Sequence, residues 1–155
     1  MSILFLITGN VFSAGSSSSD DNAKTKSNYE KAVTHIEAAK KHEKKGKLEK
    51  ANKRYAKAQG LLIKSNNKKP NDADTLNYLG FTTRKLGDFE NGEKYYLQGL
   101  AIDPNHKGIN EYLGELYVAT KRHNLAVERL EVLKGCKCEE YEQLKAVIAG
   151  QPSKY

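Results

Sequence analysis

A repeat with a period of 34 residues is the feature of this sequence that most restricts how the chain can fold. The dipeptide Leu79-Gly80 recurs as Leu113-Gly114. A weaker third copy lies upstream at a spacing of 41 residues, and its seven extra residues fall at about 66–72, in a segment of turn composition. Self-similarity at such periods is typical of arrays in which one supersecondary unit stacks on the next. The sequence therefore predicts three related units rather than a single irregular core.

Each copy is predicted to form two helices, because its apolar and small residues recur at intervals of three and four. In the middle copy the first helix is expected over about 73–86, and Gly87 can end it in a left-handed conformation. The second helix follows and must end before Pro104, which cannot continue a helix. We expect Gly80 and Gly92 to let the two helix backbones approach each other closely.

The middle copy resembles the tetratricopeptide repeat. Four stretches stand where that family has its signature: Asn77-Tyr78-Leu79-Gly80, Gly87-Asp88-Phe89, Tyr96 and Asp103-Pro104. The likeness covers residues 32–138 and is weakest in the first copy, which has His35 and His42 at apolar sites. The resemblance implies an all-α fold, a right-handed superhelical array (an α-solenoid) of antiparallel helix pairs. About three repeats are expected, at residues 32–65, 73–106 and 107–138.

The end of the chain supplies a cap for such an array. Residues 139–149 form an amphipathic segment with Glu139 and Glu140 at its start, where acidic side chains favour a helix N-terminus. Arrays of this kind need a terminal helix with a polar outer face. We therefore predict a folded domain over residues 28–149 that ends in this capping helix, followed by a tail at residues 150–155.

The beginning of the chain is typical of an export signal. An apolar stretch reaches about Phe12, which makes it too short to cross a bilayer, and small residues follow it. This pattern favours a signal peptide at residues 1–14 and a flexible serine-rich spacer at 15–27, although the usual basic start is missing. We expect a periplasmic or secreted protein, similar to exported bacterial members of the repeat family that end in a paired-cysteine segment.

Basic charge is concentrated in one part of the chain. Residues 24–69 hold 15 basic and 4 acidic groups, whereas residues 70–155 hold 11 basic and 13 acidic groups. Such a field attracts polyanions such as nucleic acid or anionic lipid. The alternative is a solvated lysine-rich helix pair, which we favour because 22 of the 26 basic residues are lysines and lysine is the weaker recognition group.

No catalytic constellation, cofactor motif or metal-binding pattern is recognisable in the sequence. Three histidines are expected to pack between helices rather than bind a metal: His35, His42 and His123. His106 follows Pro104 and is expected to be solvated. Cys136 and Cys138 are separated by one residue, and the sequence leaves open whether they form a strained disulfide, remain thiols, or serve an intermolecular or metal-binding role.

An array of this kind is expected to bind a partner segment in its concave groove, which is lined mainly by the first helix of each pair. Helix offsets from the Leu-Gly positions predict these groove residues: Lys40, Lys44, Asn77, Phe81, Arg84, Lys85, Glu111 and Glu115. The groove would run from basic to acidic. Grooves of the family that hold a peptide's terminal carboxylate use Lys, Arg and Asn, and the basic end is similar in type. We therefore predict a non-catalytic adaptor with a protein or peptide partner.

Two rival hypotheses remain open. In the main one, the lysine-rich segment 24–69 binds an anionic membrane surface electrostatically; nucleic acid is a less favoured target for it. In the weaker one, Cys136 and Cys138 bind a partner through thiol chemistry. No cofactor and no small-molecule substrate are expected under any of these hypotheses.

Overall fold

The computed structural model describes residues 26–154, and over this range the chain forms seven helices and no strand. The helices are α1 (Asn28–Lys44), α2 (Leu48–Lys68), α3 (Ala73–Lys85), α4 (Phe89–Ile102), α5 (Lys107–Ala119), α6 (His123–Leu133) and α7 (Glu139–Ile148). The predicted all-α fold is confirmed. The predicted signal peptide at 1–14 and most of the predicted spacer lie outside the described residues.

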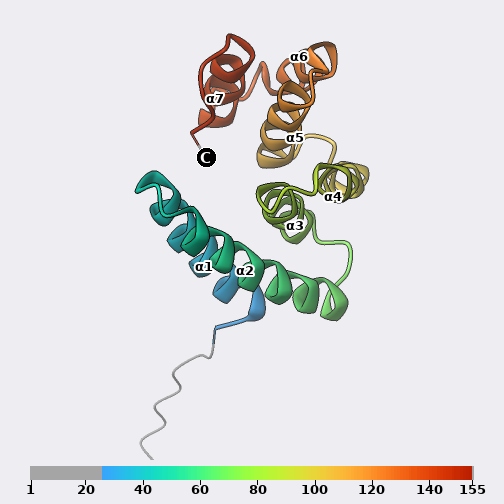
Figure 1. Ribbon diagram of the computed structural model, residues 1–155. Coiled ribbons are helices and arrows are strands. Elements are labelled where there is room, and N and C mark those ends of the chain that lie inside the picture. Colours follow the sequence, from blue (N-terminus) through green and yellow to red (C-terminus); the bar gives the residue numbers. More distant parts are fainter. Residues whose placement is uncertain (1–25, 155) are drawn as a thin grey trace, which may run out of the picture.

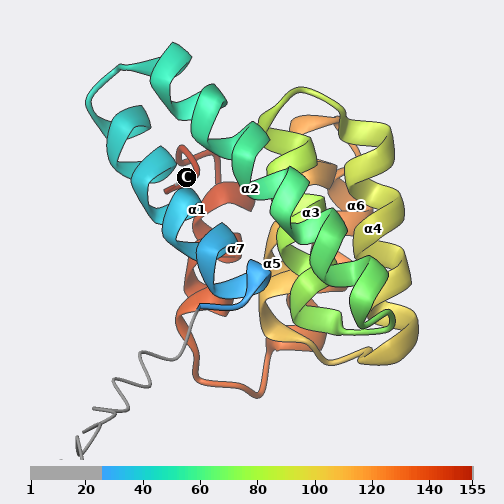
Figure 2. The same cartoon turned by 90° about the horizontal axis from the view of Figure 1, so that it is seen from below.

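The helices pack as three consecutive pairs: α1 with α2, α3 with α4, and α5 with α6. Figure 1 shows these pairs stacked along a curve, with α7 packed on the last pair. The segment after α7 extends into the space between α7 and the first pair, and Figure 2 shows the same arrangement from below. The array is therefore a curved solenoid whose own C-terminal segment lies on its concave side.

Local sequence signals account for where the helices begin and end. The Ser27 hydroxyl accepts a hydrogen bond from the backbone N–H of Glu30, and the Glu30 carboxylate accepts one from the backbone N–H of Ser27, so that α1 begins with a capping box. The turns inside the three pairs have a left-handed residue at equivalent positions: Gly46 (φ 66°), Gly87 (φ 95°) and Lys121 (φ 61°). Glycine adopts this conformation without strain, whereas lysine does not.

The glycines of the middle pair bring α3 and α4 into close contact, as predicted. A Cβ atom at Gly80 would lie 2.4 Å from the ring of Tyr96, and one at Gly92 would lie 3.2 Å from the carbonyl oxygen of Gly80. In the next pair, Gly114 faces Leu144 of α7, because a Cβ atom there would lie 2.5 Å from that side chain. The recurring glycine therefore makes room for α4 of the same pair at Gly80, and for the final helix α7 at Gly114.

Two local expectations were wrong. The extra residues at about 66–72 are not all turn, because α2 continues to Lys68. It ends there because Pro70 disfavours helical geometry at Lys69. His106 is not solvated: its Nδ1 accepts from the backbone N–H of Ile109 and caps α5, while its Nε2 lies 3.0 Å from Asp74. No helix among the described residues has the length and hydropathy needed to span a bilayer.

Candidate binding groove

The concave side is formed by α1, α3 and α5, with α7 and the C-terminal segment at one edge. We call this surface the groove. Three hollows open on it, with volumes of about 470, 350 and 280 Å³. The two smaller hollows share Glu43 and Ser153 as lining residues. The first helix and the C-terminal segment therefore meet in the groove.

A buried ion pair joins α3 to α5 at the centre of the groove. Both terminal nitrogens of Arg84 lie 3.1 Å from Oε2 of Glu115. The side chains are only 8% and 1% exposed. The guanidinium also lies 5.8 Å from the ring centres of Phe81 and Tyr112. Arg84 is therefore held in place by an acidic partner and aromatic neighbours rather than projecting freely from the helix.

Aromatic rings form the floor of the groove beside this pair. Phe81 is fully buried; its ring centre is 4.9 Å from that of Tyr112 and 5.8 Å from that of Tyr55. The ammonium group of Lys40 lies 5.0 Å above the Phe81 ring, within cation–π distance. Burial lowers the pKa of Lys40, while the neighbouring Glu37 and Glu111 act in the opposite direction.

Glu43 connects α1, α2 and α3. Its Oε1 accepts from the Lys85 ammonium at 2.5 Å, and its Oε2 accepts from the Tyr55 hydroxyl at 2.8 Å. Burial raises the pKa of Tyr55, and the hydrogen bond to Glu43 adds to the effect. The phenol therefore remains a hydrogen-bond donor at neutral pH, and Lys85 is committed to a partner within the chain.

The largest of the three groove hollows lies at the N-terminal ends of α3, α5 and α7. Glu111 and Asn77 line it and are only 3% and 6% exposed. One side-chain oxygen of each, Oε1 of Glu111 and Oδ1 of Asn77, has no hydrogen-bond partner. Burial, reinforced by Glu115 and Glu140, raises the pKa of Glu111 to about 8.

The C-terminal segment crosses the groove. The hydroxyl of Ser153 donates to the Glu115 carboxylate, with oxygen–oxygen distances of 3.0 and 2.9 Å. Lys154 forms an ion pair with Glu139 at the start of α7. Ser153 and Lys154 also line a hollow together with Lys40 and Lys44 of α1. The non-helical C-terminal segment thus lies in the predicted groove, in contact with α5 and α7 and beside a hollow that α1 also lines.

The structure brings most of the predicted groove residues together, but in a different state from the one expected. Lys44 is exposed, whereas Asn77, Phe81, Arg84, Glu111 and Glu115 are buried. The expected gradient from basic to acidic is replaced by pairing, since Arg84 and Lys85 each have an acidic partner. Three residues that contribute to the groove were not predicted: Glu43, Tyr112 and Ser153. Glu43 is the first-repeat equivalent of Arg84, so the repeat alignment could have identified it.

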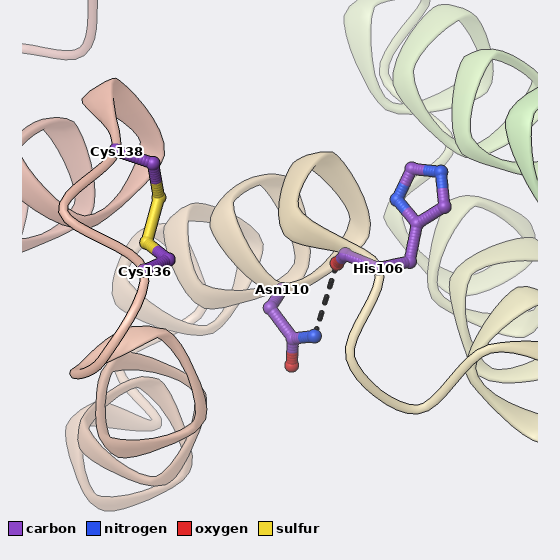
Figure 3. The surroundings of a disulfide bond; sticks show 4 residues. All are labelled: His106, Asn110, Cys136 and Cys138. Carbon is purple, nitrogen blue, oxygen red and sulfur yellow. Dashed lines mark hydrogen bonds between the residues drawn. A yellow bond between two sulfur atoms is a disulfide. The ribbon is translucent and has the colours of Figure 1, made fainter.

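Cys136 and Cys138 are joined by a disulfide in the loop between α6 and α7. Figure 3 shows this bond with Asn110, whose side-chain nitrogen donates to the carbonyl oxygen of His106 at 3.0 Å.

His123 is exposed rather than packed between helices, which corrects the prediction for that residue. Within residues 26–154 there is no cluster of three or more potential metal ligands.

Solved structures offer a comparison for this architecture. The chain is similar to the TPR domain of Arabidopsis OM64, with a TM-score of 0.50 and 15% identity over 79% of this chain and 98% of that one. The chain has a tetratricopeptide-repeat fold. Weaker likenesses are to the Yersinia enterocolitica type III secretion translocator chaperone SycD (TM-score 0.49, 17% identity, covering 77% of this chain and 86% of that one) and to the first TPR of Spaghetti (RPAP3), solved with an HSP90 peptide (TM-score 0.46, 18% identity, covering 78% and 95%). No protein-family profile and no curated protein matches the sequence.

Proposed function

We propose that this tetratricopeptide-repeat domain is a non-catalytic interaction module that binds an extended segment of a partner protein in the groove. The observation that carries the proposal is the path of the C-terminal segment. Ser153 donates to the buried carboxylate of Glu115, and Lys154 pairs with Glu139, so the groove holds a stretch of non-helical polypeptide. A partner segment would use the same kind of contacts, in competition with the tail.

The groove is also prepared for binding by its rigidity. Glu43 fixes Lys85 and Tyr55, and Glu115 fixes Arg84, so these side chains lose little conformational entropy when a ligand arrives. A preformed surface keeps more of its contact energy as affinity, because less is spent on ordering side chains. This supports a binding role for the pairs, in addition to their role in joining neighbouring repeats.

A displayed library of random peptides, selected on the full chain, would test the proposal. Selected peptides are then measured by fluorescence anisotropy against two charge-reversal variants. The groove variant carries Lys44→Glu together with Glu140→Lys. The control variant carries Glu128→Lys on α6 together with Lys134→Glu just after that helix. Both double variants keep the net charge at +7. They therefore separate the location of a charge from its total amount.

We expect selected peptides to bind the wild type and the control alike and to bind the groove variant at least about tenfold more weakly, which corresponds to about 1.4 kcal/mol. Equal affinity for all three proteins would place the binding site elsewhere and refute the proposal. Circular dichroism at each step verifies that the variants remain helical, so that a loss of binding is not a loss of fold.

One observation favours a second candidate function, electrostatic binding of an anionic membrane surface by the lysine-rich segment. A hollow of about 600 Å³ on the α1–α2 pair is lined by His42, Lys50, Lys53, Arg54, Ala56 and Lys57. Binding through such a cluster should weaken steeply as salt rises, because exposed charges are screened within about 8 Å at physiological ionic strength. Groove binding should weaken less. Flotation with anionic and neutral vesicles at two salt concentrations distinguishes them.

We further propose that the protein is exported. The apolar N-terminal stretch supports this, and so does the disulfide between Cys136 and Cys138, since disulfides persist in oxidising compartments. Expression of the full chain in a bacterial host, followed by mass spectrometry of the envelope fraction, tests it. The expected product has lost a segment that ends close to residue 14, and recovery of the intact chain from the cytoplasm would contradict export.

A further inference from the structure

The largest hollow of the groove is acidic. It has a volume of about 470 Å³ and lies where α3, α5 and α7 begin. Five carboxylate residues line it, and the lysine among its lining residues is Lys107. The carboxylates are Asp74, Asp103, Glu111, Glu139 and Glu140. A hollow with one dominant sign of charge attracts ligands of the opposite sign.

Two buried hydrogen-bond acceptors in this hollow are unsatisfied. Oε1 of Glu111 and Oδ1 of Asn77 have no partner, although both residues are more than nine-tenths buried. A buried polar atom without a partner costs free energy, because it has lost its hydrogen bonds to water and gained none in the protein. A ligand group that donates hydrogen bonds to both atoms would recover that free energy on binding.

The repeat shows that this cost is not imposed by the fold. Glu111 and Asn77 occupy equivalent positions in the third and second repeats, and the equivalent residue in the first repeat is Ile36. Ile36 is fully buried in the apolar core. The position therefore accepts an aliphatic side chain, and the two polar residues occur at this position only in the repeats that border the acidic hollow.

We propose that the acidic hollow binds a primary ammonium group, supplied by a lysine side chain of the partner segment, at Glu111 and Asn77. An ammonium group has three donors and no acceptor, which matches two unsatisfied acceptors surrounded by carboxylates. The tail supports lysine as the source, because Lys154 already pairs with Glu139 on the rim of the hollow. This inference rests on the proposed function and names the chemistry of its ligand.

Electrostatics adds a pH dependence. The titratable and charged groups around Glu111 come from every neighbouring element: Lys40 of α1, Asp74 and Arg84 of α3, Asp103 just after α4, His106 and Lys107 where α5 begins, Glu115 on its own helix, and Glu139 and Glu140 of α7. Burial raises the pKa of Glu111 to about 8, so this carboxyl group is largely protonated at pH 6. A bound ammonium favours the carboxylate, so its affinity should increase as pH rises from about 6 to about 8.

The test uses a short blocked peptide with a central lysine, its matched Nε-acetyl-lysine form, and spermidine. Binding to the full chain is measured by anisotropy or by NMR titration. We expect the lysine peptide to bind at least about tenfold more tightly than the acetylated one, because hydrogen bonds to charged groups are stronger than those between neutral groups. Glu111→Gln should abolish this preference and the pH dependence. Glu128→Gln, which removes an exposed carboxylate on α6, should leave both unchanged.

The outcomes separate this inference from the proposed function. If library-selected peptides bind the groove without a lysine and are insensitive to Glu111→Gln, the proposed function stands and the ammonium site is refuted. If no peptide binds the groove, both are refuted. If spermidine binds through Glu111 but the lysine peptide does not, the site recognises small amines, and the assignment to a partner's lysine is wrong.

Discussion

The ion pair between Arg84 and Glu115 gives the sharpest test of how the groove is built. The two side chains are 8% and 1% exposed, so neither charge can regain water if its partner is removed. Breaking a buried pair on one side costs about 3–5 kcal/mol, because it leaves an uncompensated buried charge. We expect Arg84→Met and Glu115→Leu each to lower the free energy of unfolding by this amount.

The double variant should behave differently. Replacing both charges by apolar side chains of similar size is often neutral or stabilising. We expect the free energy of unfolding of Arg84→Met with Glu115→Leu to lie within about 1 kcal/mol of the wild-type value, which implies a coupling energy of at least about 5 kcal/mol. Urea unfolding followed by circular dichroism gives these values. Glu115→Gln serves as a milder single variant in case Glu115→Leu fails to fold.

The exposed pair of Lys53 and Glu49 is the matched control. Its atoms are closer, at 2.7 Å, but its side chains are 73% and 84% exposed. Exposed pairs of this spacing on a helix contribute about 0.3–0.5 kcal/mol. If the coupling of Arg84 with Glu115 is no larger than that of the control, or if the buried double variant loses the sum of the two single effects, the reasoning from burial is refuted.

Three further predictions concern stability, each measured by urea unfolding. Burial raises the pKa of Glu111 from 4.5 to about 8, so its contribution to stability is complete below about pH 4.5 and lost as pH rises through about 8. The free energy of unfolding of Glu111→Gln, relative to the wild type, should therefore increase by up to about 1.4 kcal/mol per pH unit in that window. A difference that does not change with pH would contradict the assignment. Lys121→Gly should stabilise by about 0.5–1 kcal/mol, because Lys121 has a φ of 61° where the other pairs have glycine; no gain would show that the turn is unstrained. Changing both Cys136 and Cys138 to Ser should cost about 1.5 kcal/mol in the chain-entropy model of a very short loop; unchanged stability would show that the disulfide does not restrain the loop before α7.

Much of the fold could be predicted because its signals are local. Gly87 ends α3 and Pro104 follows α4, and each signal acts within a few residues of the place it determines. The recurring glycines could also be interpreted, since a close approach of two helices leaves no room for a Cβ atom. These features do not require knowledge of which residues become neighbours across the array.

The state of the groove could not be predicted in the same way. Arg84 and Glu115 are 31 residues apart, and their pairing depends on how the second repeat is rotated against the third. Helix offsets identified the correct face but not the partners on that face. The tail was the greatest omission, because nothing in residues 150–155 indicates that Ser153 would bond to Glu115. Its position follows from the direction in which α7 ends.

Position by position, the three repeats separate the residues that the fold needs from those it only tolerates. Lys40, Phe81 and Glu115 are equivalent by the repeat spacings of 41 and 34. At this position the side chain is in turn a cation, a ring and an anion, although packing would be served by an aliphatic residue in all three. The ammonium group of Lys40 lies over the Phe81 ring, and Glu115 holds Arg84 beside the same ring. Such variation supports the proposal that a partner binds in the groove rather than on the outer face of the solenoid.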